Sequence, residues 1–145
     1  MKSLSVKLGV ILFIIGLIIS YNVEVWGADW KAYGASEIMG VYYYDASSIT
    51  HPSKNIVRVW DKIVFSEKGV INAVEKLGER YKNTSFAISL TEFDCIEKKT
   101  RMLKCVFYSK DERVILPSSE QPSKTEWDFI IPGTMADTLH NAVCK

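Results

Sequence analysis

The three cysteines of this 145-residue chain are the residues whose type and spacing point most directly to chemistry. Cys95 and Cys105 flank a short charged segment, and Cys144 is the penultimate residue. Thiols of exported proteins are usually oxidised, whereas cytosolic thiols stay reduced. The cysteines therefore raise two questions: which compartment the chain enters, and which two of them form a disulfide.

Metal chemistry would need further ligands near these thiols. His51 lies in a turn-like segment and His140 on a helical pattern, with no second histidine at ligand spacing. No HExxH, GxSxG, P-loop or CxxC motif occurs. A site made of Cys95, Cys105 and a histidine is conceivable but disfavoured, so we expect no metal and no cofactor.

Two carboxylates could form an acid/base pair. Glu92 and Asp94 are two residues apart and would share one face of a strand, as the pair of a small hydrolase would require. The alternative is that Arg101, roughly opposite across a turn, pairs with Asp94 and holds the hairpin together. We favour this alternative, and we therefore expect no catalytic residues and no enzyme.

The element that positions these residues is a hairpin. Apolar and polar residues alternate along Ile88–Cys95 and Arg101–Tyr108, which predicts two antiparallel strands joined by the polar segment between them. Similar patterns predict further strands at 29–33, 38–45, 55–65, 114–116 and 127–131, with turn residues at 34–36 and 51–53.

Two segments change to helical spacing. Apolar residues recur from Val70 to Leu77 behind Ser66, a good N-cap, and this helix is expected to end near Tyr81. Thr134 with Asp137 three residues later forms a capping-box pattern, which predicts a C-terminal helix.

The N-terminal segment 1–27 has the pattern of an export signal. Lys2 and Lys7 precede the apolar run Leu8–Ile19, which is shorter than the roughly 20 residues that a membrane-spanning helix needs. Small residues before Ala28 suit cleavage, leaving 28–145 as one mature domain without a membrane span. The alternative is an uncleaved anchor. We expect export to the periplasm, the outer surface or the medium.

Composition limits the classes of partner. The 18 Lys and Arg residues against 17 Asp and Glu give no indication of nucleic-acid binding. The candidate binding surface consists instead of local clusters. The basic residues are Lys98, Lys99, Arg101 and Lys104, and the aromatic residues are Tyr42, Tyr44, Trp60 and Trp127. The alternatives are that the basic cluster is only a solvated turn and that two or three of the aromatic residues line the core under a helix.

The succession of motifs resembles the surface-adhesin protein E family of Gram-negative bacteria. The resemblance rests on these segments: Tyr42–Asp45, Val57–Trp60, Glu92–Cys95 with Arg101, Trp127–Thr134 and Val143–Cys144. It implies an α+β fold, an antiparallel sheet of about six strands with a C-terminal helix packed on it, a short helix between strands, and a disulfide. It also implies a host-binding adhesin that dimerises. The missing lipobox cysteine and the additional Cys105 depart from the family pattern.

The disulfide is expected between Cys95 and Cys144. With the turn centred near Lys98 and Lys99, Cys95 would face Met102 or Arg101, so Cys105 would lie roughly 10 Å or more away, beyond the reach of a disulfide. Cys105 alternates with apolar neighbours and suits a free buried thiol, and the family resemblance favours the same pair.

These observations predict an exported, non-catalytic module that binds a protein partner of unknown identity. The alternative is a structural subunit of the cell envelope that self-associates, for example as a homodimer through an open sheet edge.

Overall fold

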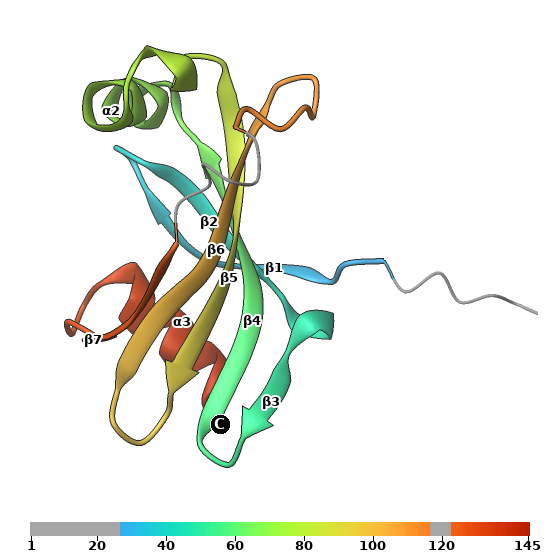
Figure 1. Cartoon of the computed structure of the whole chain (residues 1–145), viewed down its shortest axis with the longest axis vertical. Coiled ribbons are helices and arrows are strands. Elements are labelled where there is room, and N and C mark those ends of the chain that lie inside the picture. The colour runs from blue at the N-terminus through green and yellow to red at the C-terminus, as the bar shows by residue number, and fades with distance from the viewer. Residues whose placement is uncertain (1–26, 117–122) are drawn as a thin grey trace, which may run out of the picture.

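The computed structural model describes residues 27–116 and 123–145 (Figure 1). The expected export signal therefore lies outside the described residues, except for Gly27, and so does most of the segment between Leu116 and Lys124.

A seven-stranded antiparallel sheet forms the body of the molecule, which confirms the α+β class. Six strands run in the order β1-β2-β4-β5-β6-β7, and β3 pairs with β4. The strands are β1 (Trp30–Ser36), β2 (Gly40–Asp45), β3 (Thr50–Ser53), β4 (Ile56–Phe65), β5 (Thr84–Asp94), β6 (Lys99–Ser109) and β7 (Lys124–Phe129).

Two α-helices are found among the described residues, α2 (Glu67–Leu77) and α3 (Met135–Val143). Both begin as predicted, because Ser66 Oγ accepts a hydrogen bond from Gly69 N and Thr134 Oγ1 accepts one from Asp137 N. Helix α2 ends at Leu77, and a separate 3-10 turn, Glu79–Tyr81, follows Gly78. A second 3-10 turn, Ala46–Ser48, follows β2.

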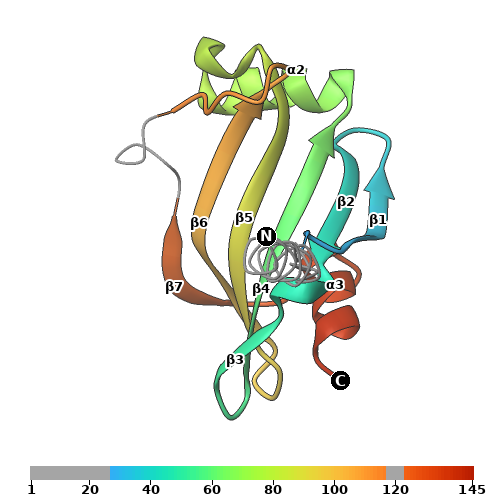
Figure 2. The ribbon, with the colours of Figure 1, turned by 90° about the vertical axis from the view of Figure 1, so that its right-hand side faces the viewer.

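Both helices lie on one face of the sheet, α2 across one end and α3 across the other (Figures 1 and 2). We call this the covered face and its opposite the open face. Each helix has its own core cluster. Around α2 lie Ala73, Tyr81, Ala87, Cys105, Phe107 and Leu116, and around α3 lie Val57, Val59, Phe93, Leu139 and Val143.

Three segments differ from the expectation. The strand β1 continues through Gly34 with a register shift instead of breaking there, and Gly34 leaves room for Met135, whose Sδ would lie 2.6 Å from a Cβ at that position. The segment 51–53 belongs to β3 and not to a turn. The expected strand 114–116 contributes one isolated bridge, between Tyr108 and Val114.

Candidate functional site

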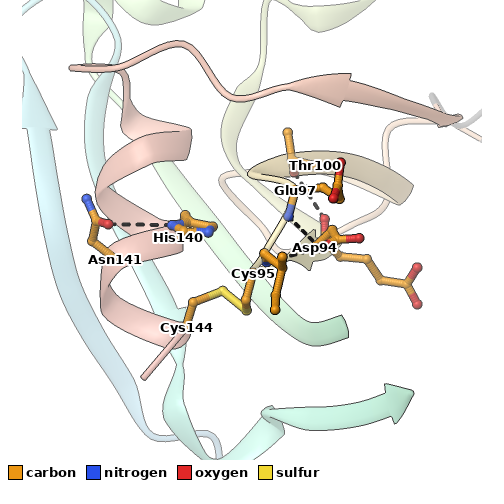
Figure 3. The surroundings of a disulfide bond; sticks show 9 residues. Asp94, Cys95, Glu97, Thr100, His140, Asn141 and Cys144 are labelled. Atoms are coloured by element: carbon orange, nitrogen blue, oxygen red, sulfur yellow. Dashed lines mark hydrogen bonds between the residues drawn. A yellow bond between two sulfur atoms is a disulfide. The ribbon is translucent and has the colours of Figure 1, made fainter. Parts of the chain in front are cut away.

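The disulfide joins Cys95 to Cys144, with their Cα atoms 5.5 Å apart, and this confirms the predicted pair. It connects the turn between β5 and β6 to the residue that follows α3 (Figure 3). Cys105 is a buried free thiol, as expected. Burial raises its pKa, although a hydrogen bond with Ser89 opposes that shift.

The turn of the central hairpin lies earlier than predicted. Asp94 is opposite Lys99, so the turn consists of residues 95–98, and Lys98 adopts a positive φ of 51°. Cys95 therefore does not face Met102 or Arg101, and that expectation was wrong. Cys105 is opposite Ser89, far along the ladder from Cys95, so the exclusion of a Cys95–Cys105 disulfide still holds.

The predicted pair between Asp94 and Arg101 is also wrong. Asp94 Oδ1 accepts hydrogen bonds from Ile96 N and Glu97 N and so holds the turn. Arg101 lies opposite Glu92 in the ladder and binds Glu92 Oε2 at 2.7 Å. The earlier turn shifts the register and so gives Arg101 a different carboxylate.

Glu92 lies at the centre of an ion-pair cluster on the open face. Its side chain is 1% exposed, and Arg58 binds the second carboxylate oxygen, Oε1, at 2.6 Å. Burial alone would raise the pKa of Glu92, but the hydrogen bonds and charges of Arg58 and Arg101 outweigh it and hold the pKa below its usual value. Guanidinium groups bind both oxygens of Glu92, so this carboxylate is engaged in ion pairs and not in the acid/base pair with Asp94 that was considered as the less favoured possibility.

Aromatic rings lie against cations across the open face. The Trp127 ring lies 4.4 Å from the Arg101 guanidinium carbon, and Lys62 Nζ lies 4.3 Å from the Trp30 ring centre. Trp60 lies on the same face, opposite Leu90. Each cation–π contact contributes about 0.5–1 kcal/mol at an exposed site, so this face combines positive charge with aromatic area.

Tyr42 and Tyr44 do not belong to this surface. They pack with Tyr33, at ring-centre distances of 5.8 and 6.2 Å, and Tyr44 contacts the core cluster of α3 on the covered face. Alternate positions of β2 face the helices, so these two candidates do not share a face with Trp60, and Tyr44 lines the core beneath a helix, which was the alternative for the aromatic cluster.

The tip of the central hairpin carries an apolar and basic patch that sequence reasoning found only in part. Ile96 is 68% exposed in the turn, and Phe129 and Ile131 are 74% and 68% exposed at the end of β7. This end of β7 lies beside the turn, since Ile130 N donates to Lys98 O and Lys99 is paired with Phe129. We define the hairpin-tip patch as Ile96, Lys98, Lys99, Phe129 and Ile131.

Lys98 and Lys99 were predicted, whereas the three apolar residues were missed. The alternation at residues 127–131 places residues 129 and 131 on the same side of the strand, but it does not say whether that side faces the core or solvent. The pairing of Phe129 with Lys99 on β6 decides this, because it turns Phe129 away from the core. Lys104 is exposed on β6 opposite Leu90, further along the open face.

Comparison with known proteins agrees with this geometry. The family model described as Surface-adhesin protein E matches residues 30–145. The chain belongs to the surface-adhesin protein E family. A comparison with curated proteins finds no match.

Solved structures of protein E from Haemophilus influenzae are similar to this member of the family. For crystal form II the identity is 17% and the TM-score 0.53, covering 77% of this chain and 91% of that one. For the selenomethionine form the identity is 16% and the TM-score 0.49, covering 71% and 78%. At this identity, the first match supports the shared fold. Among the described residues, neither helix is long and apolar enough to cross a membrane.

Proposed function

We propose that this member of the surface-adhesin protein E family is an exported, non-catalytic binding module of the bacterial cell envelope. Its partner is a protein, and the contact is made by the hairpin-tip patch and the adjoining open face. The observation that carries the proposal is the grouping of three exposed apolar side chains with two lysines at one corner of the sheet.

Without a partner, the apolar side chains of the hairpin-tip patch face water. Large apolar residues exposed together are unfavourable in water and often mark interaction sites. Lys98 is exposed, and Lys99 Nζ lies 4.9 Å from the Phe129 ring centre, so the positive charge borders the apolar area directly. Such a patch suits an acidic and apolar surface on a partner, with charge setting the association rate.

The disulfide supports the patch. It holds the turn of the hairpin to the end of α3, while Asp94 fixes the turn backbone through two hydrogen bonds. A turn that is fixed before binding loses less conformational entropy when a partner arrives. The Asp94 carboxylate therefore acts as a positioning group of the binding surface.

The test begins with the exported protein as bait, followed by identification of the retained proteins. Lys98→Glu with Lys99→Glu, and separately Phe129→Ser with Ile131→Ser, should each remove the proteins that the wild type retains. The lysine double variant should slow association, and added salt should have the same effect on the wild type.

The matched control is Lys68→Glu with Lys76→Glu, which makes the same charge change on exposed positions of α2, at the other end of the sheet. It should retain the wild-type set of proteins. If the tip variants also retain that set, the tip is a solvated turn and the proposal fails.

A second function, self-association as an envelope subunit, has one observation in its favour. The strand β7 is an edge of the sheet and ends at the exposed Phe129, with the exposed Ile131 two residues beyond it. Light scattering of the exported protein over a range of concentrations separates the two functions, since a monomer at all concentrations contradicts self-association.

Export itself is part of the proposal. We expect the mature protein to begin at Ala28 or Asp29, which N-terminal sequencing of the native protein checks. Recovery from membranes with Met1 intact would contradict cleavage.

A further inference from the structure

The side chains around the disulfide have the composition of a metal site. The ligand atoms of Cys95, Cys144 and His140 all lie within 4.8 Å of one another. In this structure the two sulfurs are joined to each other. When that bond is reduced, the same place holds two thiols and an imidazole, which are ligands that Zn²⁺ prefers.

His140 is the unusual member of this group. It is 6% exposed, and its Nε2 atom is buried without a hydrogen-bond partner among the described residues. Buried polar atoms are normally paired, so an unpaired ring nitrogen requires an explanation. Figure 3 shows the His140 ring beside the disulfide, with one edge facing Asn141.

The neighbours of His140 favour a free lone pair on Nε2. Its Nδ1 atom lies 3.5 Å from Asn141 Oδ1, and Asn141 Nδ2 lies 3.5 Å from Asp137 Oδ1. With the proton on Nδ1, that atom donates to the amide oxygen and Nε2 is left as an acceptor. Histidines that bind metal ions are commonly oriented by such a hydrogen bond from their other nitrogen.

The site has access to solvent. A hollow of about 220 Å³ is lined by these three residues together with His51, Lys54, Asn55, Val57 and Lys145. An ion held by three protein ligands would thus have a fourth coordination position open to water.

We propose that Cys95, Cys144 and His140 form a Zn²⁺ site that becomes available when the disulfide is reduced. A dithiol reductant supplies two electrons and two protons, the S–S bond breaks into two thiols, and the reductant becomes a disulfide. Zn²⁺ then replaces the two thiol protons, which pass to solvent, and accepts the lone pair of His140 Nε2. Coordination of the ion by both cysteines then connects the hairpin turn to the end of α3 in place of the disulfide.

The test uses the exported protein after reduction with a phosphine, desalted without oxygen and titrated with Co²⁺ and then Zn²⁺. The reduced wild type should bind one Co²⁺ with the intense visible bands of tetrahedral cobalt and a thiolate-to-cobalt charge-transfer band, and Zn²⁺ should remove both. The oxidised protein should show neither band.

Two variants decide which residues bind. His140→Ala should weaken Co²⁺ binding by about tenfold or more and change the visible bands. Cys105→Ser, which removes the thiol outside the cluster, should bind as the wild type does. Equal affinity with and without His140, or loss of binding in Cys105→Ser, would overturn the proposal.

Reduction alone could unfold the chain, so near-ultraviolet circular dichroism is recorded at each step. If the reduced protein loses its native spectrum, Zn²⁺ should restore it in the wild type and fail to restore it in His140→Ala. A spectrum that Zn²⁺ restores equally in both would show that two thiolates suffice, and would contradict the assigned role of His140.

Discussion

The two faces of the sheet each bury a carboxylate, and they treat it in opposite ways. On the open face, Glu92 lies between two arginines, which keep its pKa below the usual value despite burial. On the covered face, Asp61 lies between the two core clusters, where burial raises its pKa to about 7, although a hydrogen bond from Thr91 opposes the shift. The difference follows from the partners, since two guanidinium groups bind Glu92, whereas Asp61 accepts a hydrogen bond from the neutral Thr91 hydroxyl.

This contrast has a consequence for stability. Glu92 contributes stability above the pKa that it has in the unfolded chain, and this contribution is lost as the pH falls through its lower folded value. Asp61 has the opposite sign, because its folded pKa is raised and the folded state holds a proton that the unfolded chain has released. Its contribution falls as the pH rises from about 4 to about 7.

The largest expected effect comes from Glu92→Gln. The amide keeps the shape but leaves Arg58 and Arg101 without their shared countercharge. Breaking a fully buried pair costs about 3–5 kcal/mol. We expect a loss of about 2–4 kcal/mol, because the two arginine side chains are 39% and 31% exposed and are partly solvated.

Urea unfolding at pH 7 measures the effect of Glu92→Gln. Glu97→Gln is the control, since Glu97 is 61% exposed and lies 3.8 Å from Lys99, and it should change the free energy of unfolding by less than about 0.5 kcal/mol. Equal losses of unfolding free energy in the two variants would mean that the ion pairs of Glu92 stabilise the fold no more than the exposed pair of Glu97 does.

The next effect is a gain. Asp61→Asn keeps an oxygen that accepts the Thr91 hydrogen bond and removes the cost of ionisation. A pKa of about 7 in the folded state sets an upper limit of about 4 kcal/mol at pH 8. We expect about 1–2 kcal/mol, because the amide must also be desolvated.

The pH profile separates this gain from a general packing effect. Below about pH 3 the aspartate is protonated in both states, so the gain should be small at pH 4 and vanish below about pH 3. Asp128→Asn, at an exposed position of β7 where the carboxylate pairs with Lys124, should change the free energy of unfolding by less than about 1 kcal/mol at every pH. A gain from Asp61→Asn that is the same at pH 4 and pH 8 would contradict the raised pKa.

The sequence was sufficient for the features that depend on local signals. Alternation identified the central hairpin, and the helix caps at Ser66 and Thr134 were predicted from neighbouring residues alone. Polar residues fill every position from Glu97 to Arg101, so no apolar signal fixed where the turn lies. That is why Arg101 was assigned to Asp94 and not to Glu92.

The candidate site depended on tertiary pairing that alternation could not resolve. Tyr42, Tyr43 and Tyr44 are consecutive, so the sequence assigns no face to them, and only the pairing of Tyr44 with Asp61 places Tyr44 beneath the helices. The strand β3 contains Pro52 and no apolar residue, a pattern that is tolerated at a sheet edge but gives no strand signal.

The smallest effect distinguishes aromatic residues that stabilise the open face from those available for binding. Trp127 is partly buried against Arg101, whereas Phe129 is 74% exposed beside Lys99. Threonine at either position keeps the strand preference. Trp127→Thr should cost about 1 kcal/mol, from the cation–π contact and the lost burial. Phe129→Thr should change stability by less than about 0.5 kcal/mol while weakening partner binding.

Thermal melting of both variants, combined with the bait experiment, checks the pair. If Phe129→Thr were the more destabilising change, Phe129 would be part of the packed structure, and the hairpin-tip patch would lose its central residue.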